Sequence, residues 1–230
     1  MVAIVSSTIK PLVEKAVSFY SFEERLAQTL LTLVRLRDAG FDRVLLADNS
    51  PTLSQEELER LLQDFPDINV YYIPQYQFLN KGINELLMLL FLIRHIPPNQ
   101  EIFKISGRYF PTRDFFKPAF TDFAFKAYDL NKKTGTVSTR GYWAKDAATL
   151  QGFLLRCLEE HFSYPTRVVG IKSMFRQVFS TNKMGNRVNI SIEFAAANIL
   201  KADNYKILLL DNIGIEGYVA GSNKVEKLIE

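Results

Sequence analysis

The chain has 230 residues, of which 47% are hydrophobic and 13% aromatic, enough to bury a substantial core. Its 28 basic and 25 acidic residues give a net charge of +3, and the basic residues are scattered, so we expect no nucleic-acid partner. A single cysteine excludes an intramolecular disulfide and fits a reducing compartment, which predicts a cytoplasmic protein, with peripheral contact at an inner membrane as an alternative.

The first half of the chain alternates apolar runs with helical periodicity. Two of the helical segments begin with a capping box, Ser21 with Glu24 and Ser54 with Glu57. The third is apolar on most faces, which indicates burial against a sheet, and its apolar run is too short to span a bilayer. The alternation predicts an α/β fold with a parallel sheet and right-handed crossovers. The expected strands are residues 2–7, 42–47, 68–73 and 102–105, and the expected helices are residues 21–38, 52–65 and 83–96.

The second half of the chain is less regular. Cys157 lies in an apolar helical pattern, so we interpret it as a core residue rather than a nucleophile. The tail, residues 214–222, bears glycines and is expected to loop back toward the end of the fourth strand. Residues 165–180 are ambiguous, with a strand and a short helix as one interpretation. The further expected elements are strands over 136–142 and 206–210 and helices over 146–161 and 190–201.

Four polar clusters follow the predicted strands or precede a crossover helix. In a parallel sheet they converge on one edge, the edge at which α/β proteins bind ligands. Each cluster alone has a structural explanation, such as a helix cap or a turn, but together they favour a site for a nucleotide or sugar phosphate. They are Ser6-Ser7-Thr8, Asp48-Asn49-Ser50, Lys81-Gly82-Ile83-Asn84-Glu85 and Ser106-Gly107-Arg108-Tyr109.

The last of these clusters carries the strongest chemical signal. Gly107 lets the backbone turn or approach a ligand closely, and Arg108 offers a rigid fork of donors that suits phosphate. The alternative is that Arg108 pairs with a nearby carboxylate and that Tyr109 packs in the core. The spacing alone leaves both interpretations open.

With these motifs in order, residues 2–143 resemble the nucleotide-sugar glycosyltransferases of the GT-A fold. The likeness rests on the hydroxyl residues after the first strand, Arg25, the ADNSP turn (47–51), the KGINE helix start (81–85) and the FKISGRYF segment (103–110). The last is similar to the KxSGRY-type segment of some bacterial glycan-assembly transferases. The resemblance implies one GT-A-like domain over residues 1–230, with 1–107 as the nucleotide-binding half and 108–230 as the acceptor-side half.

The implied activity is sugar transfer from a nucleotide-diphosphate donor to a glycan, lipid-linked or other hydroxyl acceptor, as in polysaccharide biosynthesis. A homodimer is compatible with the sequence. The resemblance places the nucleoside base and ribose against Ser6, Thr8, Asp48 and Asn49. The remaining residues expected to contact the donor are Arg25, Lys81, Asn84, Ser106, Gly107, Arg108 and Tyr109.

Catalysis would use Arg108, with Lys81 or Lys104, to neutralise the leaving diphosphate. Glu193 is the first candidate for the base that an inverting enzyme needs, although a solvated first-turn glutamate is the alternative. Asp146 is the second candidate. An acceptor platform is expected from Arg140, Tyr142 and Trp143, against the alternative that the lone tryptophan lies in the core.

The chain departs from the family where most members carry an Asp-x-Asp that holds a metal. It has Ser106-Gly107-Arg108 there, with Asp114 a few residues on. We therefore expect no tightly bound cofactor, and whether Mg²⁺ or Mn²⁺ takes part, with Asp114 as a ligand, stays open.

Two other classes of protein remain possible interpretations of the sequence. One is a sugar-phosphate nucleotidyltransferase, although the SSTIKP segment (6–11) lacks the expected glycine-rich loop, and the other is a non-catalytic carbohydrate-binding protein.

Overall fold

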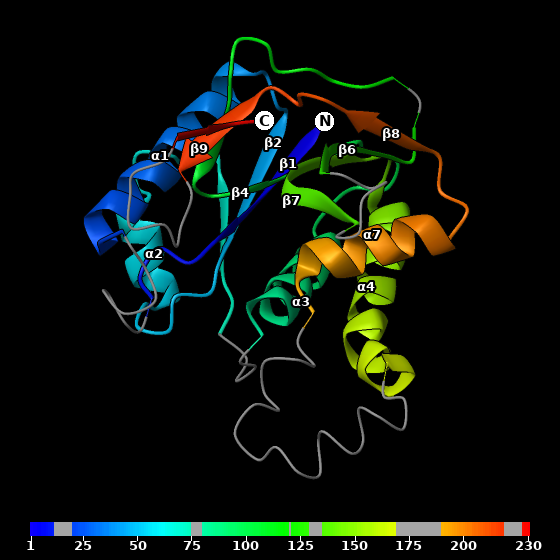
Figure 1. Cartoon of the computed structure of the whole chain (residues 1–230). Helices are drawn as coiled ribbons and strands as arrows, with labels where there is room; N and C mark the ends of the chain where they lie inside the picture. Colours follow the sequence, from blue (N-terminus) through cyan, green and yellow to red (C-terminus); the bar gives the residue numbers. More distant parts are fainter. Residues whose placement is uncertain (12–19, 75–79, 120, 129–134, 169–189, 219–226) are drawn as a thin grey trace.

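The computed structural model describes residues 1–11, 20–74, 80–119, 121–128, 135–168, 190–218 and 227–230 (Figure 1). Its helices are α1 (Phe22–Asp38), α2 (Gln55–Leu61), α3 (Lys81–Ile93), α4 (Ala147–Val168) and α7 (Ile192–Ala202). Its strands are β1 (Val2–Ser7), β2 (Arg43–Asp48), β3 (Asn69–Tyr72), β4 (Ile102–Ser106), β5 (Tyr109–Pro111), β6 (Phe123–Tyr128), β7 (Thr136–Ala144), β8 (Ile207–Leu210), β9 (Ile215–Tyr218) and β10 (Lys227–Ile229).

The centre of the fold is a seven-stranded sheet with the order β3-β2-β1-β4-β7-β6-β8. Strands β3, β2, β1 and β4 are mutually parallel, so their carboxyl ends meet at one edge. Strand β7 runs antiparallel to β4 and β6, and β8 is parallel to β6. The prediction of an α/β fold with a mostly parallel central sheet flanked by helices is confirmed.

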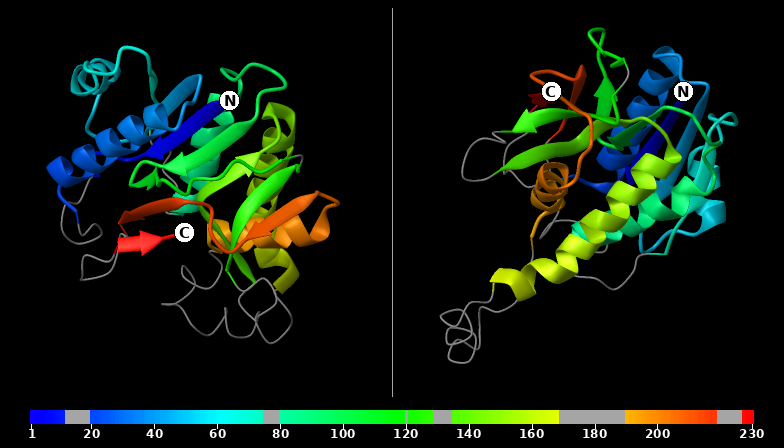
Figure 2. Two further views of the ribbon diagram at one scale, coloured as in Figure 1. Left: turned by 90° about the horizontal axis from the view of Figure 1, so that it is seen from above. Right: turned by 90° about the vertical axis from the view of Figure 1, so that its right-hand side faces the viewer.

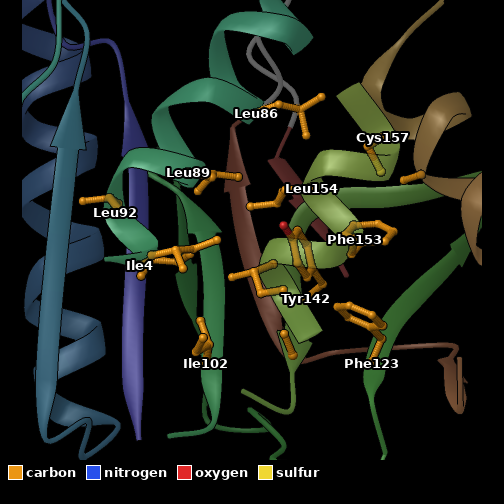
Figure 3. Close-up of a cluster of buried hydrophobic side chains, with 14 of the residues drawn as sticks. Ile4, Leu86, Leu89, Leu92, Ile102, Phe123, Tyr142, Phe153, Leu154 and Cys157 are labelled. Carbon is orange, nitrogen blue, oxygen red and sulfur yellow. The ribbon is translucent and has the colours of Figure 1, made fainter. Parts of the chain in front are cut away.

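Helices cover both faces of this sheet, as the views in Figures 1 and 2 show, with α1 and α2 on one side and α3, α4 and α7 on the other. Leucines of α3 point toward Ile4 of β1 and the face of the sheet, and α4 packs beside them (Figure 3). Helix α3 is therefore covered by both the sheet and α4, which explains its apolar sequence. Cys157 of α4 is 0% exposed in this core, and burial raises the pKa of its thiol.

The helix starts agree with the sequence. Ser21 accepts a hydrogen bond from the Glu24 amide at 3.2 Å, and the Glu24 carboxylate accepts one from the Ser21 amide at 2.8 Å. Ser54 and Glu57 form the same capping box. Helix α2 ends at Leu61, earlier than the predicted residue 65.

A second, three-stranded sheet with the order β10-β9-β5 was not predicted. The glycine-bearing tail does return to the end of β4, but part of it forms strand β9, whose Tyr218 amide donates to the Arg108 carbonyl at 3.3 Å. Strand β6 lies within the phenylalanine-rich segment (115–128) and pairs with β7. Of the ambiguous residues 165–180, those from 169 onward lie outside the described residues.

Within the described part of the chain, the helices are too short or too polar to cross a membrane.

Candidate functional site

Gly107 brings the end of β4 close to the end of β1 and to helix α1. Its amide donates to the Ser6 carbonyl at 2.8 Å, and its carbonyl accepts from the Thr29 hydroxyl at 3.0 Å. A Cβ atom at this position would lie 3.2 Å from Thr29 Oγ1 and 3.3 Å from Ser7 Oγ, so there is little room for a side chain. The tight turn delivers Arg108 directly at the carboxyl edge of the sheet.

Asp48 organises the two loops that follow β1 and β2. Its side chain is fully buried, and its two carboxylate oxygens accept from the backbone amides of Ile9 and Ser50, each at 2.8 Å. Beside it the Thr8 hydroxyl donates to the side-chain oxygen of Asn49. Thr8, Asp48 and Asn49 therefore lie together at the predicted edge, and their hydrogen bonds shape the loops there.

Three cations from separate elements share this edge: Arg25 of α1, Lys81 at the start of α3, and Arg108 after β4. The Arg25 guanidinium donates to the Thr8 carbonyl at 2.6 Å. Burial lowers the pKa of Arg25 to about 10, with a further lowering by Arg108 and an opposing effect of Asp48. The pKa of Lys81 is lowered by partial desolvation and then by Arg25 and Arg108. Because the three charges repel one another, this region attracts anions.

Arg108 adds a buried donor to this positive region. Its Nη1 is buried and has no hydrogen-bond partner among the residues that the structure describes. Burial lowers the pKa of Arg108, Arg140 lowers it further, and Tyr109, Glu85 and Tyr20 oppose the shift. A buried guanidinium N–H without an acceptor is costly, so an anionic ligand at this point would satisfy it.

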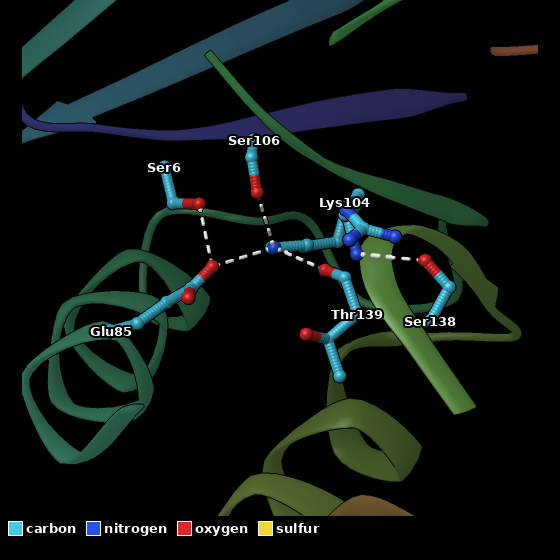
Figure 4. Close-up of polar contacts among 7 residues, drawn as sticks. Ser6, Glu85, Lys104, Ser106, Ser138 and Thr139 are labelled. Atoms are coloured by element: carbon cyan, nitrogen blue, oxygen red, sulfur yellow. Dashed lines mark hydrogen bonds and ion pairs between the residues drawn. The ribbon is translucent and has the colours of Figure 1, made fainter. Parts of the chain in front are cut away.

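Beneath the edge lies an ion pair between α3 and β4 (Figure 4). Lys104 is 1% exposed, and its Nζ lies 2.6 Å from Glu85 Oε1 and donates to the Thr139 carbonyl at 2.6 Å. Ser6 donates to Glu85 Oε1 at 2.8 Å, and Ser106 accepts from Lys104 at 3.1 Å. Burial alone would raise the pKa of Glu85, but Lys104 and Ser6 outweigh it and hold that pKa below its ordinary value.

This pair changes the interpretation of the two serines. The sequence assigned Ser6 and Ser106 to the donor, whereas the structure shows their hydroxyl groups bonded to Glu85 and Lys104. The sequence signal for the pair was a lysine inside an otherwise apolar strand, because a buried lysine needs a partner. Asn84, which neighbours Glu85 in the first turn of α3, is 3% exposed.

Arg140 and Tyr109 complete the edge on the side of β7. The Arg140 guanidinium lies 5.7 Å from the centroid of the Tyr109 ring and forms an ion pair with Glu230. Tyr109 is 2% exposed, and burial raises the pKa of its hydroxyl while Arg140 and Arg108 oppose the shift. Arg140 thus lies close enough to Arg108 to lower its pKa.

Trp143, which was assigned to an acceptor platform, lies in the core instead. It is 3% exposed and stacks on Phe41 and Phe115, with ring centroids 5.9 and 5.5 Å away. Its indole N–H donates to the Phe116 carbonyl at 3.0 Å. Asp114 is exposed and precedes Phe115, so its loop packs over this aromatic cluster.

Asp146 has a structural role at the start of α4, where its Oδ1 accepts from the Thr149 amide at 2.7 Å. Strand β7 is antiparallel to β4, so α4 begins at the edge opposite Ser106. This position is wrong for a base acting beside Arg108.

Glu193 lies in the first turn of α7, which begins at the N-cap Ser191. A Cβ atom on Gly82 in the first turn of α3 would lie 3.1 Å from Ile192 Cβ, so the two first turns are in contact. This contact brings Glu193 to the edge of the sheet that carries Lys81. The Glu193 side chain is half-buried.

No protein-family model matches the sequence, and no curated protein is significantly similar to it. The nucleoside-diphosphate-sugar pyrophosphorylase from Vibrio cholerae RC9 is similar in structure, with a TM-score of 0.52, 11% sequence identity and 94% of each chain covered. Galactosyltransferase LgtC in complex with donor and acceptor sugar analogs matches with a TM-score of 0.47 and 8% identity, over 78% of this chain and 70% of that chain. The first likeness shows that this fold occurs in a nucleotide-sugar enzyme.

Proposed function

We propose that the protein is a glycosyltransferase that holds a nucleoside-diphosphate sugar at the carboxyl edge of β1, β2 and β4. The observation that carries this proposal is the cluster of Arg25, Lys81 and Arg108, in which Arg108 lies close enough to lower the pKa values of Arg25 and Lys81. A diphosphate would neutralise the positive charge of this cluster, and one of its oxygens could accept a hydrogen bond from the buried Arg108 Nη1. The fold shared with a nucleoside-diphosphate-sugar pyrophosphorylase supports a nucleotide sugar as the ligand.

In the proposed reaction an acceptor hydroxyl oxygen forms a bond to the anomeric carbon of the donor. The bond from that carbon to the diphosphate oxygen breaks, and the oxygen keeps the electron pair. Arg108 and Lys81 neutralise the charge that develops on this oxygen. In an inverting reaction the hydroxyl proton passes to Glu193, the carboxylate on the acceptor side.

Two acidic residues at this edge, Asp48 and Glu85, are already engaged by donors of the protein. Both oxygens of Asp48 accept backbone amides, and Glu85 is bound to Lys104 and Ser6. Within the described residues no three His, Cys, Asp or Glu side chains are grouped so that they could hold a metal. Since Mg²⁺ and Mn²⁺ need oxygen ligands, we propose that arginine and lysine provide the positive charge at the diphosphate.

Nucleotidyl transfer is the competing reaction, because the similar Vibrio structure belongs to a pyrophosphorylase. Such an enzyme would normally cradle a triphosphate in a glycine-rich, basic loop after the first strand. Residues 6–11, SSTIKP, contain no glycine. A non-catalytic carbohydrate-binding protein would need no cluster of three cations.

Thermal shift with a panel of UDP-, GDP-, dTDP- and CMP-sugars, with and without Mn²⁺, tests the proposal. We expect stabilisation by one diphosphate donor, little effect of the CMP-sugars with their single phosphate, and release of nucleoside diphosphate when an acceptor is supplied. Release of pyrophosphate from a nucleoside triphosphate and a sugar phosphate would assign nucleotidyl transfer instead. Stabilisation by glycans alone would assign a binding protein.

A further inference from the structure

The side chain of Asn80 connects three helices near the candidate site. Its Oδ1 accepts from the amides of Gly82 and Ile83 at 2.8 and 3.4 Å and so caps α3. Its Nδ2 donates to the carbonyl of Ile190 at 3.0 Å, just before α7 begins. The same Nδ2 lies 3.5 Å from Nδ1 of His161 in α4. One amide group therefore holds the beginnings of α3 and α7 and the later turns of α4 together.

His161 receives this contact in a nearly dry environment. It is 6% exposed, and its Nε2 has no hydrogen-bond partner among the described residues. The Asn80 amide nitrogen can only donate, so the hydrogen-bond network assigns the acceptor role to Nδ1 and the proton of the neutral ring to Nε2. Burial lowers the pKa of His161, and Glu160 of α4 and Glu193 of α7, the charged groups that face it, oppose the shift. From the side of α3 the neutral Asn80 faces the ring.

Asn80 is adjacent in sequence to the contact between α3 and α7. Gly82 and Ile192 are in close contact, because a Cβ atom on Gly82 would lie 3.1 Å from Ile192 Cβ. Lys81 immediately precedes Gly82, and Glu193 immediately follows Ile192. The rings of Tyr164 and Phe194 meet edge-on with centroids 5.3 Å apart, which adds a contact between α4 and α7. The position of the candidate base relative to a donor-side cation therefore depends on this contact.

We propose that Asn80 is a positioning residue, which holds the first turn of α7, and with it Glu193, in register with Lys81 at the start of α3. The inference rests on the proposed function, in which Lys81 contacts the donor and Glu193 the acceptor. A displacement of about 1 Å in such an arrangement can reduce turnover about 100-fold. The donor site itself includes Arg25 and Arg108, which Asn80 does not contact, so its affinity should change little.

Two substitutions separate the two roles of Asn80, the N-cap of α3 and the contacts with Ile190 and His161. Asn80→Ser keeps a good N-cap for α3 but cannot reach Ile190 and His161, and Asn80→Asp keeps the cap while replacing the donor by a carboxylate oxygen. In Asn80→Ser we expect kcat to fall at least about 10-fold with the donor KM within about twofold of the parent value. The exposed Asn204→Ser is the matched control and should retain parental kcat.

Two measurements do not depend on turnover. In Asn80→Asp the new carboxylate should raise the pKa of His161, as measured by NMR of the two histidines, with His95→Gln used for assignment. In Asn80→Ser the amides of the first turn of α7 should exchange with solvent faster while those of α3 stay protected. If the protein binds no nucleotide, the proposed function fails, and these two measurements alone decide on Asn80. Parental exchange in α7 and an unchanged His161 pKa would show that Asn80 only caps α3.

Discussion

The ammonium of Lys104 lies 2.6 Å from Oε1 of Glu85, directly beneath the edge of the sheet that carries Ser106 and Arg108. The lysine side chain is 1% exposed and the glutamate side chain 24% exposed. Because a buried charge is tolerated only with a partner, this pair joins α3 to β4 and forms the floor of the candidate site.

Substituting one member of this ion pair should destabilise the fold more than substituting both members together. Lys104→Met leaves the Glu85 carboxylate without its counter-charge, and we expect the free energy of unfolding in urea to fall by about 3–5 kcal/mol. Lys104→Met combined with Glu85→Gln should lose less than Lys104→Met alone. Lys145→Met, whose lysine side chain is 60% exposed, is the control and should change stability by no more than about 0.5 kcal/mol. Strictly additive losses from the two substitutions at the pair would argue against the coupling.

The same pair predicts a loss of stability in acid. The folded-state pKa of Glu85 lies below the ordinary value of 4.5, so its carboxylate stabilises the fold above that pH. This contribution should disappear as the pH falls from 4.5 through the lower folded pKa. Urea unfolding at a series of acidic pH values would show a shallower pH dependence in the Lys104→Met, Glu85→Gln double variant. An identical slope in both proteins would assign the acid sensitivity to other carboxylates.

Gly217 should be required for the position of Arg108. A Cβ atom at Gly217 would lie 2.4 Å from the Arg108 carbonyl oxygen and from Cδ1 of Tyr109, so Gly217→Ala must push β9 away from β5. We expect a lower melting temperature and weaker binding of nucleoside diphosphate. Gly152→Ala in α4 is the matched control, since its nearest atom, Tyr205 Oη, is 3.9 Å away, and it should raise stability by up to about 1 kcal/mol. Parental stability and affinity in Gly217→Ala would refute the close approach.

Sugar transfer should persist in a chelator. Asp48 and Glu85 are engaged by protein donors, and Arg108 and Lys81 provide the positive charge, so we expect turnover in EDTA to match turnover without it. The measurement is the initial rate with a saturating donor, before and after addition of Mn²⁺. Activity that vanishes in EDTA and returns with Mn²⁺ would show that a metal ion, rather than these side chains, balances the diphosphate.

The sequence was sufficient to predict the parallel strands and the edge at which they end, because both depend on local patterns. Four apolar runs separated by helices imply parallel strands, and parallel strands bring the residues after each strand together. Lys81 and Arg108 could therefore be expected at one edge from the order of elements, whereas Arg25 was expected only from the resemblance to GT-A glycosyltransferases. The capping residues Ser21 and Ser54 were equally local, and the structure confirms them.

The acceptor side depends on contacts between distant segments, which a single sequence does not show. Asp146 was assigned to the site because nothing in the sequence reveals that β7 runs antiparallel to β4. Trp143 is in the core because Phe41 and Phe115, far away in sequence, cover its ring. Asn80 was overlooked because only its side-chain contacts with α4 and α7 distinguish it from an ordinary helix cap.

Calorimetric titration tests the anion site most directly. The nucleoside diphosphate of the best donor is titrated into the parent protein and into Arg108→Ala, both in EDTA. The corresponding nucleoside, which lacks phosphate, is the matched ligand, and Arg108→Lys tests whether charge without the guanidinium fork is enough. We expect the diphosphate to bind Arg108→Ala more weakly by about 1.5–3 kcal/mol, the usual value of a charge-assisted contact, with the nucleoside unaffected. An unchanged diphosphate affinity in Arg108→Ala would contradict the assignment of this edge to the donor.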